Sequence, residues 1–132
     1  MPLVRLDHVN LRTTRLEAMK RFYATALGLV SGPRPNFSFA GAWLYCGDSP
    51  VVHLVVVDEP PEHHANLSLQ HFALRGSDLS AALRRLQSAG IDYRVGFVRD
   101  FELCQVHVSD PDGNHLHLDY PLSEAVALGL SG

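Results

Sequence analysis

The chain has 132 residues, 46% of them hydrophobic and 19% charged, so it is long enough for one domain with a hydrophobic core. Its formal net charge is -3 with no long run of one sign, which argues against binding to nucleic acid or to an acidic membrane surface. We expect no signal peptide or membrane span, because no apolar run has the required length, and two cysteines do not make a disulfide scaffold. These features predict a cytoplasmic protein.

The first half of the chain predicts one strand, one helix and then further strands. Apolar and polar residues alternate over residues 3–11, which is the period of a half-buried strand. Thr14 is the expected N-cap of a helix, and Gly28 is expected to end it. The helix has apolar residues at helical spacing, namely Leu16, Met19, Phe22, Tyr23 and Ala26. Further strands are expected around residues 37–39, 42–46 and 51–57.

The second half predicts the same order of elements. A strand over residues 69–75 is followed by a helix that begins at Ser77 or Asp78 and ends before Gly90. Strands are then expected around residues 91–98, 102–109 and 115–120. Residues 58–67 carry two prolines and join the halves as a loop, and residues 123–130 could form a short helix.

The two halves are also similar residue by residue. Residues 6–18 and 69–81 align with an offset of 63 and share six identical positions, among them His8 and His71. The segment Val52-His53-Leu54 corresponds to Leu116-His117-Leu118 with an offset of 64. Such self-similarity predicts two copies of one unit, so we expect an α+β fold of two tandem βαβββ modules. Module one covers about 1–58, module two about 68–121, and a tail 122–132 completes a single domain.

Histidine is the unusual component, because the chain has eight of them and most lie in or beside apolar runs. Side chains on a strand alternate between its faces. The helices should cover the face formed by Val9, Leu11, Phe72, Leu74, Leu116 and Leu118. The opposite face then carries His8, His53, His71 and His117, which a twofold arrangement of the modules would bring together. We interpret these four residues as ligands of one divalent metal ion; the alternative is four core histidines satisfied by hydrogen bonds alone.

Several of these segments resemble the vicinal oxygen chelate superfamily, which includes glyoxalase I, methylmalonyl-CoA epimerase, extradiol dioxygenases, fosfomycin resistance enzymes and bleomycin resistance proteins. The resemblance runs from Leu6 to Tyr120. Its most specific parts are Leu6-Asp7-His8-Val9, residues 22–29, residues 69–74 and residues 110–118 with Asp110-Pro111-Asp112-Gly113-Asn114. It implies curled mixed sheets that enclose a metal site, with helices on the outer face and ligands from the first and last strands of each module.

By that resemblance the metal ligands are His8, His53, His71 and His117. The chain departs from the family at His117, where glutamate is usual. Four neutral imidazoles would leave the charge of the ion uncompensated and make it a stronger Lewis acid. Imidazole ligands suit iron, zinc or nickel, and we leave the choice among these open.

Two further residues are candidates for catalysis. Without a carboxylate ligand, the base could be a displaced His53 or His117, or Asp119, which shares a strand face with His117. His107 lies ten residues before His117, where similar extradiol dioxygenases have a catalytic tyrosine. It could donate a proton, or it could be an ordinary strand histidine.

The resemblance implies a metal-dependent enzyme that acts on a small substrate chelating the ion through adjacent oxygens. We favour lyase or isomerase chemistry of the glyoxalase type, because four filled ligand positions suit it better than oxygen chemistry. The alternatives are an extradiol ring-cleaving dioxygenase and a non-catalytic drug-binding protein like the bleomycin resistance proteins. A homodimer is expected by resemblance, and neither the substrate nor the metal is identified by the sequence.

Overall fold

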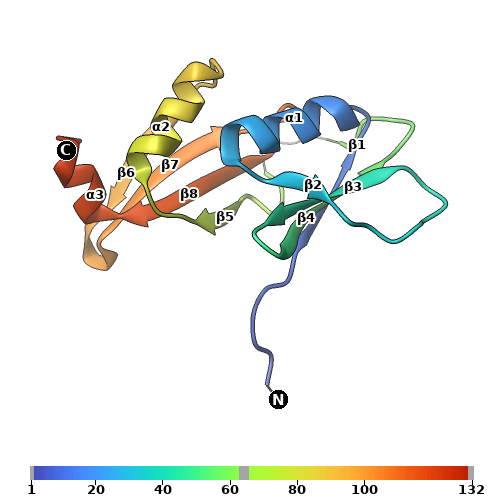
Figure 1. The fold of residues 1–132 in the computed structure, drawn as a ribbon, viewed down its shortest axis with the longest axis horizontal. Coiled ribbons are helices and arrows are strands. Elements are labelled where there is room, and N and C mark those ends of the chain that lie inside the picture. Colours follow the sequence, from blue (N-terminus) through green and yellow to red (C-terminus); the bar gives the residue numbers. More distant parts are fainter. Residues whose placement is uncertain (1, 63–65, 131–132) are drawn as a thin grey trace. The chain divides into compact units, whose positions relative to one another are not determined.

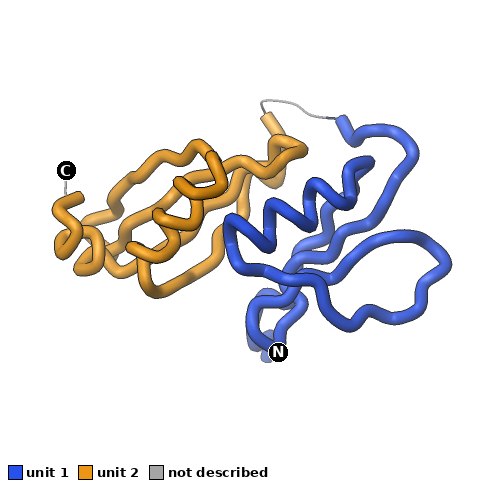
Figure 2. Tube along the Cα trace, turned by 45° about the horizontal axis from the view of Figure 1, so that its top comes forward, with its two compact units in different colours: residues 1–62 blue, residues 63–132 orange. Residues whose placement is uncertain are grey.

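A computed structural model describes residues 2–62 and 66–130. The chain divides into two compact units, residues 1–62 (unit 1) and residues 63–132 (unit 2), which are coloured separately in Figure 2. Each unit contains a four-stranded mixed sheet with helical cover, so the predicted α+β fold of two modules is confirmed.

Unit 1 follows the βαβββ order. Its elements are β1 (Val9–Thr13), α1 (Leu16–Leu27), β2 (Val30–Gly32), β3 (Gly41–Cys46) and β4 (Ser49–Val56). The strands lie in the order β1-β4-β3-β2, with β1 parallel to β4 and the other pairs antiparallel.

Unit 2 has the same topology. Its elements are β5 (Phe72–Arg75), α2 (Leu79–Ser88), β6 (Arg94–Val98), the 3₁₀ turn η1 (Arg99–Phe101), β7 (Leu103–Ser109), β8 (His115–Pro121) and α3 (Leu122–Ala127). The strand order β5-β8-β7-β6 corresponds element by element to that of unit 1. The identical order agrees with the sequence repeat.

Helix α1 packs on one face of its sheet because its apolar residues share one side (Figure 1). Met19 and Tyr23 are fully buried, and beneath them so are Leu44, Val52 and Leu54. Gly28 ends the helix in the left-handed region at φ 74°, a conformation that glycine adopts without strain. In unit 2 the short α3 packs against β7, β8 and α2.

Both first strands begin later than the alternation predicts. β1 starts at Val9 instead of residue 3, and β5 starts at Phe72 instead of residue 69. The residues before them have no strand to pair with, since β4 meets β1 only from the pair Val9 and Val52 onward. Alternation alone does not make a strand when no partner supplies the ladder hydrogen bonds.

The predicted strand over residues 37–39 is wrong, and a strand at Val30–Gly32 was missed. Residues 37–39 lie in the segment between β2 and β3, residues 33–40, which we call the Phe loop and which extends away from the sheet in Figure 1. Pro33 and Pro35 explain the difference, because proline cannot donate to a strand ladder.

Smaller differences concern caps and faces. The side chain that binds the first turn of α1 belongs to Thr13, whose hydroxyl accepts from the Arg15 amide at 2.9 Å, rather than to Thr14. On the predicted helix-covered face, Leu116 and Leu118 are buried, whereas the residues of β1 and β5, namely Val9, Leu11, Phe72 and Leu74, are only half-buried.

None of the helices in the described part of the chain has the length and apolar character needed to cross a membrane.

Candidate functional site

The four predicted ligands occupy two kinds of position. His8 and His71 each lie one residue before the first strand of their unit and are exposed. His53 in β4 and His117 in β8 are buried, with exposed fractions of 8% and 6%. Unit 1 therefore contributes His8 and His53, and unit 2 contributes His71 and His117.

In unit 1 the two rings are stacked on each other. The ring centroids of His8 and His53 are 3.8 Å apart with 9° between the planes. His53 also stacks with Trp43, its direct partner across β3 and β4, at 4.1 Å and 12°. The strand register thus holds the imidazole of His53 against an indole.

One nitrogen of each unit 1 ring is held by an oxygen. His8 Nδ1 donates to Asp7 Oδ2 at 2.7 Å, and His53 Nε2 donates to the Pro50 carbonyl at 3.0 Å. His8 Nε2 and His53 Nδ1 remain as acceptors. The bond to His8 lowers the pKa of the Asp7 carboxyl, and burial, followed by the nearby His8, lowers the pKa of His53.

In unit 2 four imidazoles lie together. The rings of His71 and His117 are 4.6 Å apart and tilted by 42°. His107, which pairs with His117 across β7 and β8, lies 5.0 Å from it, and His115 lies 5.2 Å from both His71 and His107. The structure therefore brings the candidate His107 beside the predicted ligand His117.

The two predicted ligands of unit 2 also give one nitrogen to an oxygen. His71 Nδ1 donates to the Gln70 side-chain oxygen, and His117 Nδ1 donates to Asp119 Oδ1 at 2.6 Å. His117 and Asp119 are both largely buried, with 7% and 14% of their side chains exposed. Asp119, a candidate base in the sequence, is thus held by His117 and orients its ring.

His115 and His107 form a hydrogen-bonded chain with Gln70. The Gln70 amide nitrogen donates to His115 Nδ1 at 3.1 Å, so the proton of a neutral His115 is on Nε2. That nitrogen donates to His107 Nδ1 at 2.9 Å, which leaves the proton of His107 on its own Nε2. Burial, followed by Arg94, lowers the pKa of His107 to about 4, and burial also lowers the pKa of His115, so both rings are neutral near pH 7.

The sequence interpretation missed the residues that orient these rings. Asp7 and Gln70 occupy equivalent positions in the repeat, each directly before a predicted ligand, and each binds the Nδ1 of that histidine. The repeat alignment contained this signal. All four predicted ligands donate one ring N–H to an oxygen, as metal-ligating histidines do in proteins. Their donor set fits an ion that prefers nitrogen, although within residues 2–62 and 66–130 no group of three or more His, Cys, Asp or Glu side chains is arranged to hold a metal.

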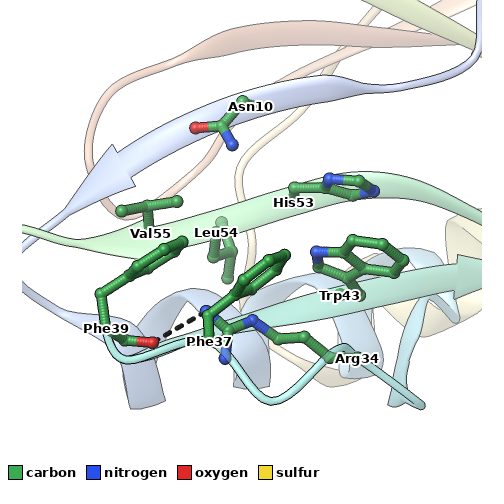
Figure 3. Close-up of a pocket in the computed structure, with 8 residues that line it drawn as sticks. All are labelled: Asn10, Arg34, Phe37, Phe39, Trp43, His53, Leu54 and Val55. Carbon is green, nitrogen blue, oxygen red and sulfur yellow. Dashed lines mark hydrogen bonds between the residues drawn. The ribbon is translucent and has the colours of Figure 1, made fainter.

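A cavity of about 140 Å³ lies in unit 1 beside His53 (Figure 3). It lies between the strands and the Phe loop, and is lined by Asn10, Arg34, Phe37, Phe39, Trp43, His53, Leu54 and Val55. Arg34 could not be recognised from the sequence, since a loop arginine is ordinarily solvated. Nor were Phe37, Phe39 and Trp43 singled out in the sequence as lining a cavity.

Comparison with known proteins agrees with this architecture. A glyoxalase family protein from Bacillus anthracis superimposes with a TM-score of 0.73 at 22% identity, covering 92% of this chain and 98% of that one. A glyoxylase/bleomycin resistance protein/dioxygenase domain from a Frankia species gives 0.75 at 16%, covering 91% and 99%. Lactoylglutathione lyase from Agrobacterium tumefaciens gives 0.64 at 17%, covering 91% and 96%. At these identities the similarity shows the fold.

Sequence comparison gives the family itself. No curated protein matches the chain. The sequence pattern of one family matches residues 5–118, which includes all four predicted ligands and every strand apart from the last three residues of β8. The chain therefore belongs to the Glyoxalase/Bleomycin resistance protein/Dioxygenase superfamily.

Proposed function

We propose that this protein is a divalent-metal-dependent enzyme that acts on a small substrate with two adjacent oxygens, by lyase or isomerase chemistry. One observation carries the proposal. His8, His53, His71 and His117 each donate one ring N–H to an oxygen and keep the other nitrogen as an acceptor. Such bonds fix the tautomer and ring orientation of a ligand histidine, which is the arrangement usual around metal-bound imidazoles.

The ion, when bound, would act as a Lewis acid toward the substrate oxygens. His117 would be held by Asp119, whose negative charge makes the imidazole a better donor of electrons. Asp119 is thus a positioning residue rather than the base. Both groups are buried, which strengthens their hydrogen bond relative to one in water.

The chain's own residues supply two roles near these ligands. His107 presents a fixed Nε2–H, and it can donate a hydrogen bond to a substrate oxygen beside His117. His53 lines the cavity, and its Nδ1 has no partner within the described residues; once displaced from the ion, His53 would be the best placed base for moving a proton between adjacent carbons. Such a proton transfer is what lyase and isomerase chemistry requires.

Lactoylglutathione lyase, one of the similar structures, is named for chemistry of this type. A second candidate is a ring-cleaving dioxygenase, and His107 favours it. This residue is a neutral donor next to a predicted ligand, where an oxygen intermediate would need a proton. The two candidates differ in the metal that they use and in their need for oxygen.

Elemental analysis of the untagged protein, followed by turnover assays, tests the proposal. Bound zinc or nickel with turnover of a hemithioacetal supports lyase or isomerase chemistry. Bound iron with oxygen uptake on a catechol supports the dioxygenase. Absence of bound metal, together with no metal-dependent rise in the unfolding temperature, would overturn both and favour a drug-binding protein. We further propose a homodimer, which light scattering of the purified protein tests.

A further inference from the structure

The cavity in unit 1 has three chemically different sides. One side is the guanidinium of Arg34, a second is formed by the rings of Phe37 and Trp43, and a third is the imidazole of His53 (Figure 3). A charged group, flat apolar walls and a predicted metal ligand surround one small space. Sites that bind small molecules combine apolar walls with a few placed polar groups in this way.

Arg34 has an unused donor. Its Nη2 donates to the Phe39 carbonyl at 2.9 Å, but its Nε is buried without a hydrogen-bond partner. Within the described residues no carboxylate forms a salt bridge with it. A buried N–H that makes no hydrogen bond is destabilising, so a ligand that supplies an acceptor would stabilise the structure. Carboxylates are the best match, because Nε–H and a terminal N–H can bind both carboxylate oxygens at once.

The Phe loop presents flat surfaces to the same space. Phe37 and Phe39 are stacked with centroids 4.9 Å apart and 9° between planes, and the Arg34 guanidinium lies against both rings at 4.9 and 5.2 Å. The two rings are 42% and 45% exposed, so they are not part of the hydrophobic core and their faces are accessible to a ligand. Trp43 continues the aromatic surface, 6.4 Å from Phe37.

The size of the cavity limits what it can hold. Its volume is about 140 Å³, and a protein cavity of about 150 Å³ accommodates one benzene ring. Flat walls favour a planar ring or a conjugated system over a branched aliphatic group, because aromatic faces stack on each other.

We propose that this cavity binds a planar carboxylate the size of one ring, with the carboxylate on Arg34 and the ring against Phe37 and Trp43. The opposite edge of the ligand then faces His53 and Asn10, which are paired in the register of β1 and β4. As a substrate subsite this inference rests on the proposed function, since it would direct oxygens on that edge toward a metal held by His53. Binding of the carboxylate itself does not need the metal.

The test uses benzoate as the probe and Trp43 as the reporter. Trp43 is the chain's single tryptophan, so quenching of its fluorescence reports the cavity directly. The full-length protein is first stripped of metal with a chelator. Benzoate should quench saturably, and its affinity should exceed that of benzyl alcohol and of acetate by at least about 10-fold, since each lacks one of the two recognised groups. Equal affinity for benzoate and benzyl alcohol would overturn the proposal.

Variants locate the binding site. Arg34→Gln should lower the affinity for benzoate by at least about 10-fold. Arg34→Lys should also lower this affinity, because lysine lacks the planar guanidinium. Arg21→Gln removes the same charge from an exposed position on α1 and should leave the affinity unchanged. If Arg34→Gln folds, as judged by its thermal unfolding, and binds benzoate as tightly as the unchanged protein, the proposal is wrong.

A second variant covers the case in which Arg34 is needed for folding. Phe37→Leu removes a flat wall but keeps the hydrogen bond from Arg34 to the Phe39 carbonyl. It should lower the affinity for benzoate several-fold and leave the affinity for acetate unchanged. An unchanged benzoate affinity in this variant would contradict the assigned aromatic wall. Because all these measurements use metal-free protein, failure of the metal analysis would sink the proposed function while leaving this inference intact.

Discussion

Each unit has its own sheet, and the two sheets carry different side chains at equivalent positions. In unit 1, Trp43 faces His53 across β3 and β4, and in unit 2, His107 faces His117 across β7 and β8. The indole stacks on its neighbour at 4.1 Å, whereas the imidazole of His107 accepts a hydrogen bond from His115. One substitution at a repeated position therefore turns an apolar wall into the end of a hydrogen-bond chain.

The predicted ligands also have more apolar surroundings in unit 1 and more polar surroundings in unit 2. In unit 1 the stacked imidazoles lie beside a cavity that has aromatic walls and one arginine. In unit 2 tilted imidazoles lie in a polar network with Gln70 and Asp119. Unit 1 therefore offers a cavity with apolar walls and one cation, whereas unit 2 offers imidazoles whose orientation is set by hydrogen bonds.

The largest expected effect follows from removing a buried ligand in unit 2. His117→Ala should lower the affinity for the metal by about 100-fold or more, equivalent to about 2.7 kcal/mol, because loss of a ligand costs more than loss of a group that orients one. Competition with a chromophoric chelator measures the affinity.

The matched control is His115→Ala, because His115 lies in the same cluster but is not a predicted ligand. It should change the metal affinity by less than about 3-fold, since it only removes a link between Gln70 and His107. Equal losses in the two variants would mean that the cluster acts as a whole and that His117 has no special role.

A smaller effect is expected for the carboxylates that hold the rings. Asp119→Asn should weaken metal binding by about 10-fold, because it removes the charge from a buried bond to His117. Asp7→Asn should have a weaker effect, since 70% of the Asp7 side chain is exposed and solvent screens its bond to His8. The same chelator competition ranks the two variants. A larger loss for Asp7→Asn would contradict the expectation that the buried bond to His117 matters more than the exposed bond to His8.

Periodicity in the sequence predicted positions in the fold, while metal binding by these residues stays a prediction. Strand alternation gives the sheet face of His53 and His117, whose neighbours Leu54 and Leu116 are buried on the other face, and the repeat gives the matching positions of His8 and His71 just before the first strand of each unit. Arg34 could not be predicted, because its position depends on contacts within the Phe loop, to the Phe39 carbonyl and the Phe37 ring. The hydrogen bonds that link Gln70, His115 and His107 likewise depend on side-chain rotamers, which the spacing of residues in the sequence does not specify.

The fold shows the same limit. The pattern located both long helices and the last strand of each unit, because these elements are defined by their own apolar residues. It placed the start of β1 too early because residues 3–8 alternate without a partner strand. It also predicted a strand in the Phe loop, where aromatic residues have high strand propensity but the prolines before them prevent pairing.

The smallest expected effect separates the two long helices. Asp78 caps helix α2, because its carboxylate accepts from the Ala81 amide at 3.2 Å, whereas no side chain caps α1 from its N-cap position. Asp78→Ala should lower the free energy of unfolding by about 1 kcal/mol, more if the left-handed backbone at φ 66° strains alanine. Thr14→Ala should change it by less than about 0.5 kcal/mol, because Thr13 and not Thr14 binds the first turn of α1. Urea unfolding of both variants measures the change in free energy. Asp78→Asn can still cap the helix and should retain most of the stability of the unchanged protein. If Asp78→Asn lowers the free energy of unfolding as much as Asp78→Ala does, the negative charge, and not the cap, stabilises α2.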